Sequence, residues 1–439
     1  MSPDQPPPGT GTGSADVPPS KAPRWLLPLL YLAGALYFTL SLYQHISRQP
    51  PWDYTVNWVA AQGMRQGISL YSPPQLHDLG LSLTGPYAQS LFLDPFTSYI
   101  GPPSTALLLL PLTFLPFAAS ITVYRVLVVL AFAASVYLAG LALPINGRRI
   151  GWSVGGLALL CFEPVVLSLG LGQVDAFVML ALAAGVWAAR RERWWLAGAA
   201  IGFAALLKIS PGLLLLYLLL RGKHKAVLGA AVTAVALLTL AALLGRPGDL
   251  WLFLSEVAPS LSTGSLHVQN QSLPAWLARL SLPGADLLTY GRGLGPFSPL
   301  GLLLGGLATL TLYLTRRKLP LSPLDYGFLV LAALLAGPLT WDHYTSWAVL
   351  SLVLLSDPGP WRGLTPRTRS GLLCLLAAGA LLMLGPTLAF PSLEVLANPA
   401  LRLLTGTKTL ALLLFCAATL YLLVRSQRLA PSQAAALGG

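Results

Sequence analysis

Long apolar segments separated by short polar ones recur along almost the whole chain of 439 residues. Clear examples are residues 25–43, 121–143, 226–244, 371–384 and 409–424. A helix that crosses the hydrocarbon core of a bilayer needs about 20 mostly apolar residues. The pattern therefore predicts an all-α, polytopic transmembrane protein.

Composition agrees with this interpretation. Hydrophobic residues make up 55% of the chain and charged residues only 10%, whereas soluble domains carry roughly 25% charged residues. The formal net charge of +12 would suggest a nucleic-acid partner in a soluble protein. Here the basic residues cluster between apolar segments, which is the pattern that orients membrane proteins. We expect membrane lipids and no nucleic acid as partners.

The basic clusters predict a topology, because short basic loops stay in the cytoplasm. The clusters are Lys21/Arg24, Arg148/Arg149, Arg190/Arg191/Arg193, Arg221/Lys223/Lys225, Arg316/Arg317/Lys318, Arg362/Arg367/Arg369 and Arg425/Arg428. One arrangement places all of them inside, with both termini. It has about twelve spans, at 24–45, 118–143, 151–169, 174–189, 195–207, 209–221, 226–244, 298–315, 323–340, 344–356, 371–389 and 407–424. The apolar stretch 103–117 is then re-entrant or lies on the outer surface.

The same arrangement predicts the domain organisation. Residues 1–23, rich in Pro, Gly and Ser, are expected to form a disordered cytoplasmic tail. A single transmembrane domain covers 24–424, and 425–439 form a second cytoplasmic tail. The segments 46–102 and 246–297 are large extracytoplasmic loops, so the outer side holds the material for a site.

Several polar residues fall near the predicted outer ends of helices. Asp53, in Trp52-Asp53-Tyr54, is a candidate general base, or alternatively a solvated loop acid or a helix cap. Gln173 and Asp175 follow a Gly-Leu-Gly turn and are either site residues or an ordinary turn with a cap. Lys208 precedes Ile209-Ser210-Pro211, where proline favours a break, and it binds a phosphate or snorkels to the interface.

Two further motifs are candidates. Trp341-Asp342-His343-Tyr344 combines an acid, an imidazole and aromatic rings, which suits a sugar or phosphate pocket or, alternatively, an interfacial aromatic belt with a cap. Asn270-Gln271-Ser272 matches a glycosylation sequon. Glu163 lies inside an apolar segment, paired with another group or pointing into a cavity. The three cysteines form neither a disulfide framework nor a metal motif, and no nucleotide-binding motif is present, so we expect no cofactor.

The chain resembles glycosyltransferase family 87, membrane enzymes of the GT-C fold that use polyprenyl-phosphate sugars. The resemblance is densest over residues 169–225, which hold the Gly-Gln turn, two Arg-containing clusters and Lys208-x-x-Pro211. Further matches are Asp53 through Tyr71-Ser72-Pro73, Pro102-Pro103, residues 270–273 and 341–343.

The resemblance implies a hexosyltransferase that transfers a sugar, mannose, from a polyprenyl-phosphate donor to a glycolipid or glycan acceptor. It implies inversion at the anomeric carbon, Asp53 as the catalytic base, no metal, and a site on the extracytoplasmic face of the bacterial inner membrane. The expected substrate-binding residues are Gln173, Asp175, Lys208, Asn270, Gln271, Trp341, Asp342, His343 and Tyr344. Lys208 and His343 would stabilise the leaving phosphate, with Arg279 and Arg292 as further candidates.

Two other functions remain open from the residues alone. One is a secondary transporter, or a flippase of a lipid-linked or small solute, although related halves are expected of many such proteins and none is evident here. The other is a binding or assembly component without activity.

Overall fold

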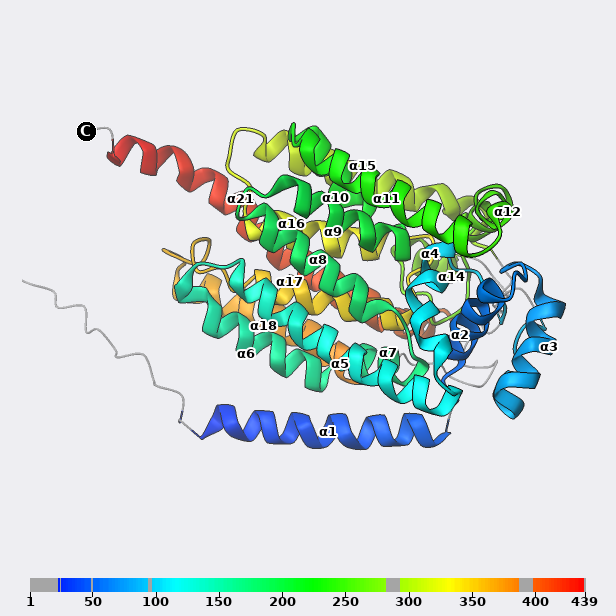
Figure 1. The fold of residues 1–439 in the computed structure, drawn as a ribbon. Coiled ribbons are helices and arrows are strands. Elements are labelled where there is room, and N and C mark those ends of the chain that lie inside the picture. Colours follow the sequence, from blue (N-terminus) through cyan, green and yellow to red (C-terminus); the bar gives the residue numbers. More distant parts are fainter. Residues whose placement is uncertain are drawn as a thin grey trace, which may run out of the picture.

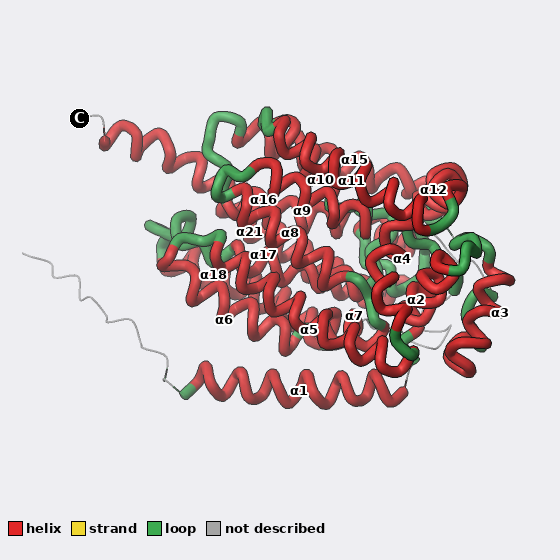
Figure 2. The backbone as a smooth tube through the Cα atoms, viewed as in Figure 1, coloured by secondary structure: helices red, strands yellow, loops and turns green. Residues whose placement is uncertain are grey.

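The computed structural model describes residues 23, 25–48, 50–93, 97–281, 293–386 and 398–437. Within this part of the chain all regular secondary structure is helical, apart from a single β-bridge between Asn270 and Trp341. Figures 1 and 2 show a bundle of roughly aligned helices with a group of shorter helices at one end. The prediction of an all-α protein is confirmed.

The two groups of helices lie in different parts of the molecule. The aligned bundle consists of α1 (Leu26–Arg48), α5 (Phe117–Leu141), α6 (Ile145–Cys161), α7 (Glu163–Leu171), α8 (Asp175–Ala189), α9 (Trp194–Leu207), α10 (Gly212–Leu220), α11 (His224–Leu244), α15 (Ser298–Arg316), α16 (Pro323–Ala336), α17 (Ala348–Leu354), α18 (Pro366–Leu384) and α21 (Thr407–Leu437). The end group includes α2 (Trp52–Arg65), α3 (Pro73–Thr84), α4 (Pro103–Leu109), α12 (Pro247–Leu252), α13 (Ala258–Ser262), α14 (Leu273–Ser281), the 3₁₀ helix η5 (Asp342–Trp347) and α20 (Pro399–Arg402).

Within the described residues, six helices are long and apolar enough to cross a membrane, or seven if α6 and α7 form one span. The expected count of twelve is therefore not confirmed. A helix lies in each of the twelve predicted segments, but α8, α9, α10, α16 and α17 have only 7 to 15 residues. At 1.5 Å per residue, helices this short cover at most about three quarters of the hydrocarbon thickness.

The predicted span 151–169 is two helices that meet at an angle of 60°. Phe162 separates them in an extended conformation. Pro164 lies in the first turn of α7 and has no N–H to continue the hydrogen-bond ladder of α6, so the helix restarts in a new direction. The predicted break near Lys208 is confirmed, since α9 ends at Leu207 and α10 begins at Gly212, directly after Pro211.

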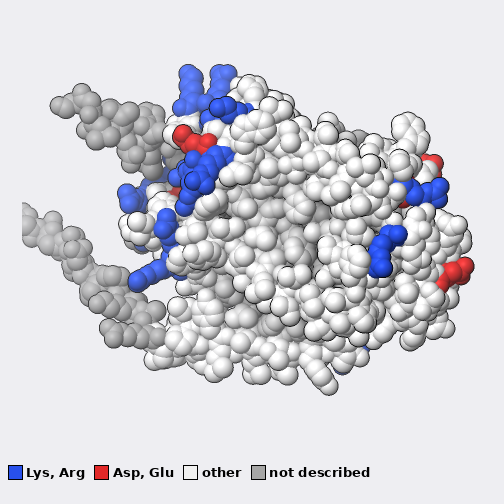
Figure 3. Space-filling view, viewed as in Figure 1, with Lys and Arg blue, Asp and Glu red and all other residues white. Residues whose placement is uncertain are grey.

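The surface has the character of a membrane protein. Large hydrophobic side chains are exposed along the outer helices, for example Leu36 of α1, Val129 of α5, Val235 of α11 and Leu303 of α15. Figure 3 shows that charged residues on the visible face gather toward the two ends and leave a broad uncharged zone between them. An exposed apolar surface this large needs lipid to cover it.

Five of the predicted cytoplasmic clusters, those that begin at Arg190, Arg221, Arg316, Arg362 and Arg425, share one end of the described bundle. Arg190 and Arg221 donate to the backbone carbonyls of Leu321 and Leu319, and Arg425 donates to those of Arg362 and Gly363. Lys21 and Arg24 lie outside the described residues, as do Asp94, Asp286, Arg292 and Glu394. Because the loops that carry these basic residues are hydrogen-bonded to one another, they face the same side of any membrane.

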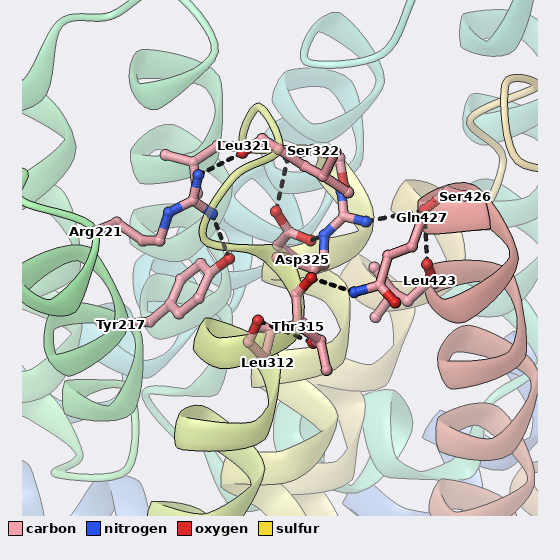
Figure 4. Close-up of polar contacts among 12 residues, drawn as sticks. Tyr217, Arg221, Leu312, Thr315, Leu321, Ser322, Asp325, Leu423, Ser426 and Gln427 are labelled. Carbon is pink, nitrogen blue, oxygen red and sulfur yellow. Dashed lines mark hydrogen bonds and ion pairs between the residues drawn. The ribbon is translucent and has the colours of Figure 1, made fainter. Parts of the chain in front are cut away.

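Figure 4 shows a buried polar cluster at this basic end. Arg316 of α15 pairs with Asp325 of α16 and donates to Ser322 and to Ser426 of α21. Arg221 donates to Tyr217 at 2.7 Å. Three bundle helices are therefore joined by charged and polar contacts at the end opposite α2 and α3.

The two long segments predicted to face outward contact each other at that opposite end. The carboxylate of Asp249 accepts hydrogen bonds from Ser69 Oγ at 2.5 Å and from the backbone N–H of Leu70 at 3.1 Å. Both segments are largely helical in their described parts, with α2 and α3 in one and α12 to α14 in the other. They form one layer over the end of the bundle.

Candidate active site

Three elements bring Asp175, Lys208 and His343 together at the end of the bundle beneath α2. Asp175 is the first residue of α8 and is fully buried. Its Oδ1 lies 2.8 Å from Nζ of Lys208, and its Oδ2 lies 2.6 Å from Nδ1 of His343. One carboxylate therefore orients a cation from the α9–α10 break and an imidazole from η5.

The backbone around this group explains how it is formed. Gly172 adopts a left-handed conformation with φ of 74°, and an added Cβ there would lie 2.5 Å from Cβ of Tyr54. Only glycine permits both the turn and this close approach. The Tyr124 hydroxyl donates to the carbonyl of Gln173 at 2.9 Å and fixes the turn. The start of α2, with Asp53, is thus held against the turn that precedes Asp175.

Asp53 is the second residue of α2 and is partly buried. Burial raises the pKa of its carboxyl group, while His343, a hydrogen bond from Gln173 and the charge of Lys208 act in the opposite direction. Asp175 adds a further small increase. Asp53 therefore belongs to the same electrostatic group, and a carboxylate with a raised pKa is a stronger base than an exposed one.

Lys208 is held on three sides. Its ammonium group lies 3.2 Å from the ring centroid of Tyr344 and 6.0 Å from that of Trp347, and its Nζ lies 3.3 Å from Oε1 of Gln173. The faces of aromatic rings attract a cation. With Asp175 as its counter-ion, Lys208 points into the protein and does not snorkel to the membrane surface.

Asn270 and Gln271 lie elsewhere and have no free polar atoms. The Asn270 amide donates to the carbonyls of Ser265 and Pro338 and accepts from the N–H groups of Ser272 and Thr340. Asn270 is also fully buried, so its sequon is not accessible to a glycosylating enzyme.

The Gln271 amide is engaged in the same way. It donates to the carbonyls of Val268 and Thr405, and its oxygen accepts from the backbone of Lys408 and Thr409. These two side chains tie three segments together. Their expected role in substrate binding stays a prediction, and their contacts indicate a role in positioning the loop.

Trp341 and Asp342, the first two residues of the aromatic motif, lie near Asn270. Trp341 pairs with Asn270 through the backbone bridge and its ring meets His267 edge-on, 6.0 Å between centroids. Asp342 is buried and interacts electrostatically with Arg279. His343 and Asp342 therefore point to different partners, although they are adjacent in sequence.

Arg279 was a candidate for the leaving phosphate. It is fully buried, and its guanidinium donates to the carbonyls of His267 and Asn270 and to both oxygens of Thr405. Burial lowers its pKa, and Asp342 acts in the opposite direction. These contacts use four of its five N–H donors, which indicates a role in holding this loop. Its expected contact with the leaving phosphate stays a prediction.

Glu163 pairs with Lys408, whose Nζ lies 3.7 Å from Oε2 of the glutamate. Lys408 also donates to the carbonyls of Leu382 and Gly385. Of the two possibilities that the sequence left open for Glu163, a paired partner or a cavity, the structure shows the partner. This pair joins α7 to α21 within the bundle.

Sequence reasoning identified most of these residues singly and missed how they pair. Nothing in the sequence shows that Asp175 serves both Lys208 and His343, because His343 is 168 positions away. Ser168, which donates to Asp175 at 3.3 Å, and Tyr124 were not foreseen. Among the described residues, no group of three or more His, Cys, Asp or Glu side chains is arranged to hold a metal ion.

Comparison with known proteins adds independent information. The model of glycosyltransferase family 87 matches residues 99–340, more than half of the chain. The polyprenol-phosphate-mannose-dependent alpha-(1-2)-phosphatidylinositol pentamannoside mannosyltransferase of Mycobacterium tuberculosis is 28% identical over 281 residues, which are 61% of this chain and 59% of that protein.

Two further relatives are similar to the same degree. The protein of the same description from Mycolicibacterium smegmatis is 26% identical, over 60% of this chain and 62% of that protein. A phosphatidylinositol mannoside mannosyltransferase of M. tuberculosis is 26% identical, over 66% and 67%. The chain thus spans about three fifths of the length of the first two relatives.

Proposed function

Because the chain belongs to glycosyltransferase family 87, we propose that it is a membrane hexosyltransferase that moves mannose from a polyprenyl-phosphate donor to a glycolipid or glycan acceptor. The names of the relatives supply the donor and suggest an acceptor of the phosphatidylinositol mannoside class. Membership of this family does not fit the transporter and assembly interpretations.

In the proposed reaction Asp53 is the general base. Its carboxylate takes the proton of an acceptor hydroxyl as that oxygen attacks the anomeric carbon of the donor sugar. The bond from this carbon to the phosphate oxygen breaks, and polyprenyl phosphate leaves with the electron pair. Attack and departure occur on opposite faces of the sugar, so the configuration is inverted. The raised pKa of Asp53 supports the choice, because a general base works best when its pKa lies near the working pH.

The leaving phosphate gains negative charge, and preorganised cations and hydrogen-bond donors stabilise such charge. Lys208 and His343 are the proposed groups, each oriented by one oxygen of Asp175. Gln173 contacts Lys208, and the ring of Tyr344 lies under its ammonium group. In this proposal Asp175 is a positioning residue, since it acts through the other two.

We place the reaction on the extracytoplasmic face of the bacterial inner membrane. Asp53, Lys208 and His343 lie at the end of the bundle opposite the basic loops, and the positive-inside rule puts basic loops in the cytoplasm. Residues 24–424 would act as one transmembrane domain, with 1–23 and 425–439 as cytoplasmic tails.

The observation that carries this proposal is the joint position of Asp53, Asp175, Lys208 and His343 at one end of the bundle. The test is transfer of radiolabelled mannose from polyprenyl-phosphate mannose by membranes that contain the chain, with lipid extracts as acceptors. We expect a labelled glycolipid that is absent from membranes without the protein. Labelled product of equal amount in both would refute the proposal.

A further inference from the structure

A cavity of about 410 Å³ lies between the C-terminal end of α1 and the first turns of α5. Its walls include Arg48, Pro51, Tyr87, Phe117 and Arg125. In Figure 1 the end of α1 and the start of α5 lie at the same end of the molecule as α2. Pro51 directly precedes α2, so the cavity adjoins the start of the helix that carries Asp53. None of the residues described above as the candidate active site lines it.

Among the described residues, the ones that line the cavity carry only positive charge. Arg48 and Arg125 line it, and no lining residue is acidic. Nε of Arg125 is buried and has no hydrogen-bond partner among the described residues. His45 is close enough to Arg125 to interact electrostatically, and its Nε2 is also buried without a partner. Arg125 is half-buried and Arg48 is exposed, so an anion could reach both, and an anion would also supply the partner that Nε of Arg125 lacks.

The shape and the donors suit a phosphate. Guanidinium groups present planar pairs of donors that match phosphate oxygens, so arginine is favoured at such sites. A volume of about 410 Å³ falls within the range of small-molecule sites, about 300–1,000 Å³. Tyr87 and Phe117, whose ring centroids are 5.4 Å apart, form an aromatic wall for the adjoining part of a ligand.

The position of the cavity points to a ligand that arrives from the bilayer. α1 packs mainly on α6 and α7 and exposes large apolar side chains such as Leu36 and Leu40 along its length. A lipid beside α1 could therefore place its headgroup at the cavity while its chains stay in the membrane. Arg48 and Arg125 form no ion pair with a described residue, unlike Lys208, whose charge is neutralised by Asp175. The two arginines are therefore available to the headgroup of such a lipid.

We propose that this cavity binds a phosphate group carried by a lipid, with Arg125 and Arg48 as its ligands. The inference rests on the proposed function for the source of that phosphate, which is the acceptor's own phosphodiester, because the donor's single phosphate is assigned to Lys208 and His343. An acceptor held in the cavity would have its reacting end next to Asp53. Arg125 and Arg48 would then hold a substrate at a point separate from Lys208 and His343.

The test is lipid binding by the purified full chain in detergent, measured by native mass spectrometry without any transfer step. The probes are farnesyl phosphate for the donor and dioctanoyl phosphatidylinositol for the acceptor, with farnesol and dioctanoylglycerol as uncharged counterparts. Arg125→Gln should weaken binding of dioctanoyl phosphatidylinositol by about tenfold or more, and should leave farnesyl phosphate and the uncharged probes unaffected. Arg149→Gln, at an exposed arginine of α6, is the matched control.

Each outcome decides the proposal. A loss confined to phosphatidylinositol supports the inference. A loss that includes farnesyl phosphate would overturn it, because the donor's phosphate would then bind here and not at Lys208 and His343. If Arg125→Gln does not fold, Arg48→Gln, at an exposed side chain, replaces it. Wild-type binding of both phosphate probes by the folded variants would overturn the inference. A chain that binds phosphatidylinositol through these arginines but transfers no sugar would contradict the proposed function alone.

Discussion

Asp175 of α8 lies 2.6 Å from Nδ1 of His343 in η5, while its other oxygen lies 2.8 Å from the ammonium group of Lys208. The fully buried carboxylate thus connects two segments that each follow an interruption in the bundle. An imidazole that donates from Nδ1 to a carboxylate is fixed in one tautomer and one orientation. Asp175 is thus the counter-ion of Lys208 and, in the proposed reaction, the residue that positions His343, and these two roles can be measured separately.

Replacing Asp175 by Asn should destabilise the protein by about 3–5 kcal/mol, because Lys208 would become a buried charge without a counter-ion. The double variant Asp175→Asn/Lys208→Met should recover much of this loss, since both charges are removed. Thermal unfolding in detergent measures both, with Glu256→Gln as a control at an exposed acid. Equal destabilisation in the single and double variants would show that the ion pair is not the cause.

The pH dependence of transfer should report the environment of Asp53. The base must be ionised to accept a proton, so kcat/KM should fall as the pH drops through the pKa of Asp53, which burial raises above the usual value of about 3.9. Lys208 lowers this pKa, so Lys208→Met should move the acidic limb of the residual activity to higher pH. A limb that stays in place, or moves to lower pH, would contradict the proximity of the two groups.

The local features of this site could be predicted from the sequence, whereas contacts between residues far apart in the chain could not. Local signals sufficed for the turn at Gly172 and for the break before Pro211, because glycine and proline restrict the backbone directly. The partners of Asp175 were not predictable, since contacts between separate helices leave no local pattern. The internal hydrogen bonds of Asn270 were missed for the same reason, although the motif itself was noticed.

Transfer should survive chelation of divalent metals. Asp175 is paired with Lys208, and among the described residues no three His, Cys, Asp or Glu side chains lie at the spacing of metal ligands. Activity in EDTA should equal activity in buffer, measured with the labelled-mannose assay. Complete loss that manganese or magnesium restores would instead make some of these acids metal ligands.

The orientation of the bundle should be visible by cysteine labelling. In a variant without the native cysteines, Ser82→Cys in α3 and Ser262→Cys in α13 should react with an impermeant reagent from outside, because both side chains are exposed in the outer layer. Ser370→Cys, exposed near the basic end, should react only after permeabilisation. The opposite pattern would invert the proposed orientation.

The sequence predicts the all-α membrane class correctly, but not the number of spans or the bends within them. Apolar segments identify helices such as α5 and α11 because each is long enough to span a bilayer by itself. They overstate the number of spans, because α10 and α17 are apolar yet have only 9 and 7 residues. Pro164 is plain in the sequence, but whether a proline bends a span by 60° or leaves it nearly straight depends on the helices packed around it.

The most direct test of the central claim is the turnover of Asp53→Asn. Asparagine keeps the size of the side chain but cannot accept the proton, so sugar transfer should fall by about 100-fold or more, while donor binding and thermal stability stay near wild type. Asp78→Asn, at an exposed acid of α3, should transfer normally. If Asp53→Asn transfers sugar at a rate close to wild type, and Asp175, Asp342 or Glu256 proves essential instead, Asp53 is not the base.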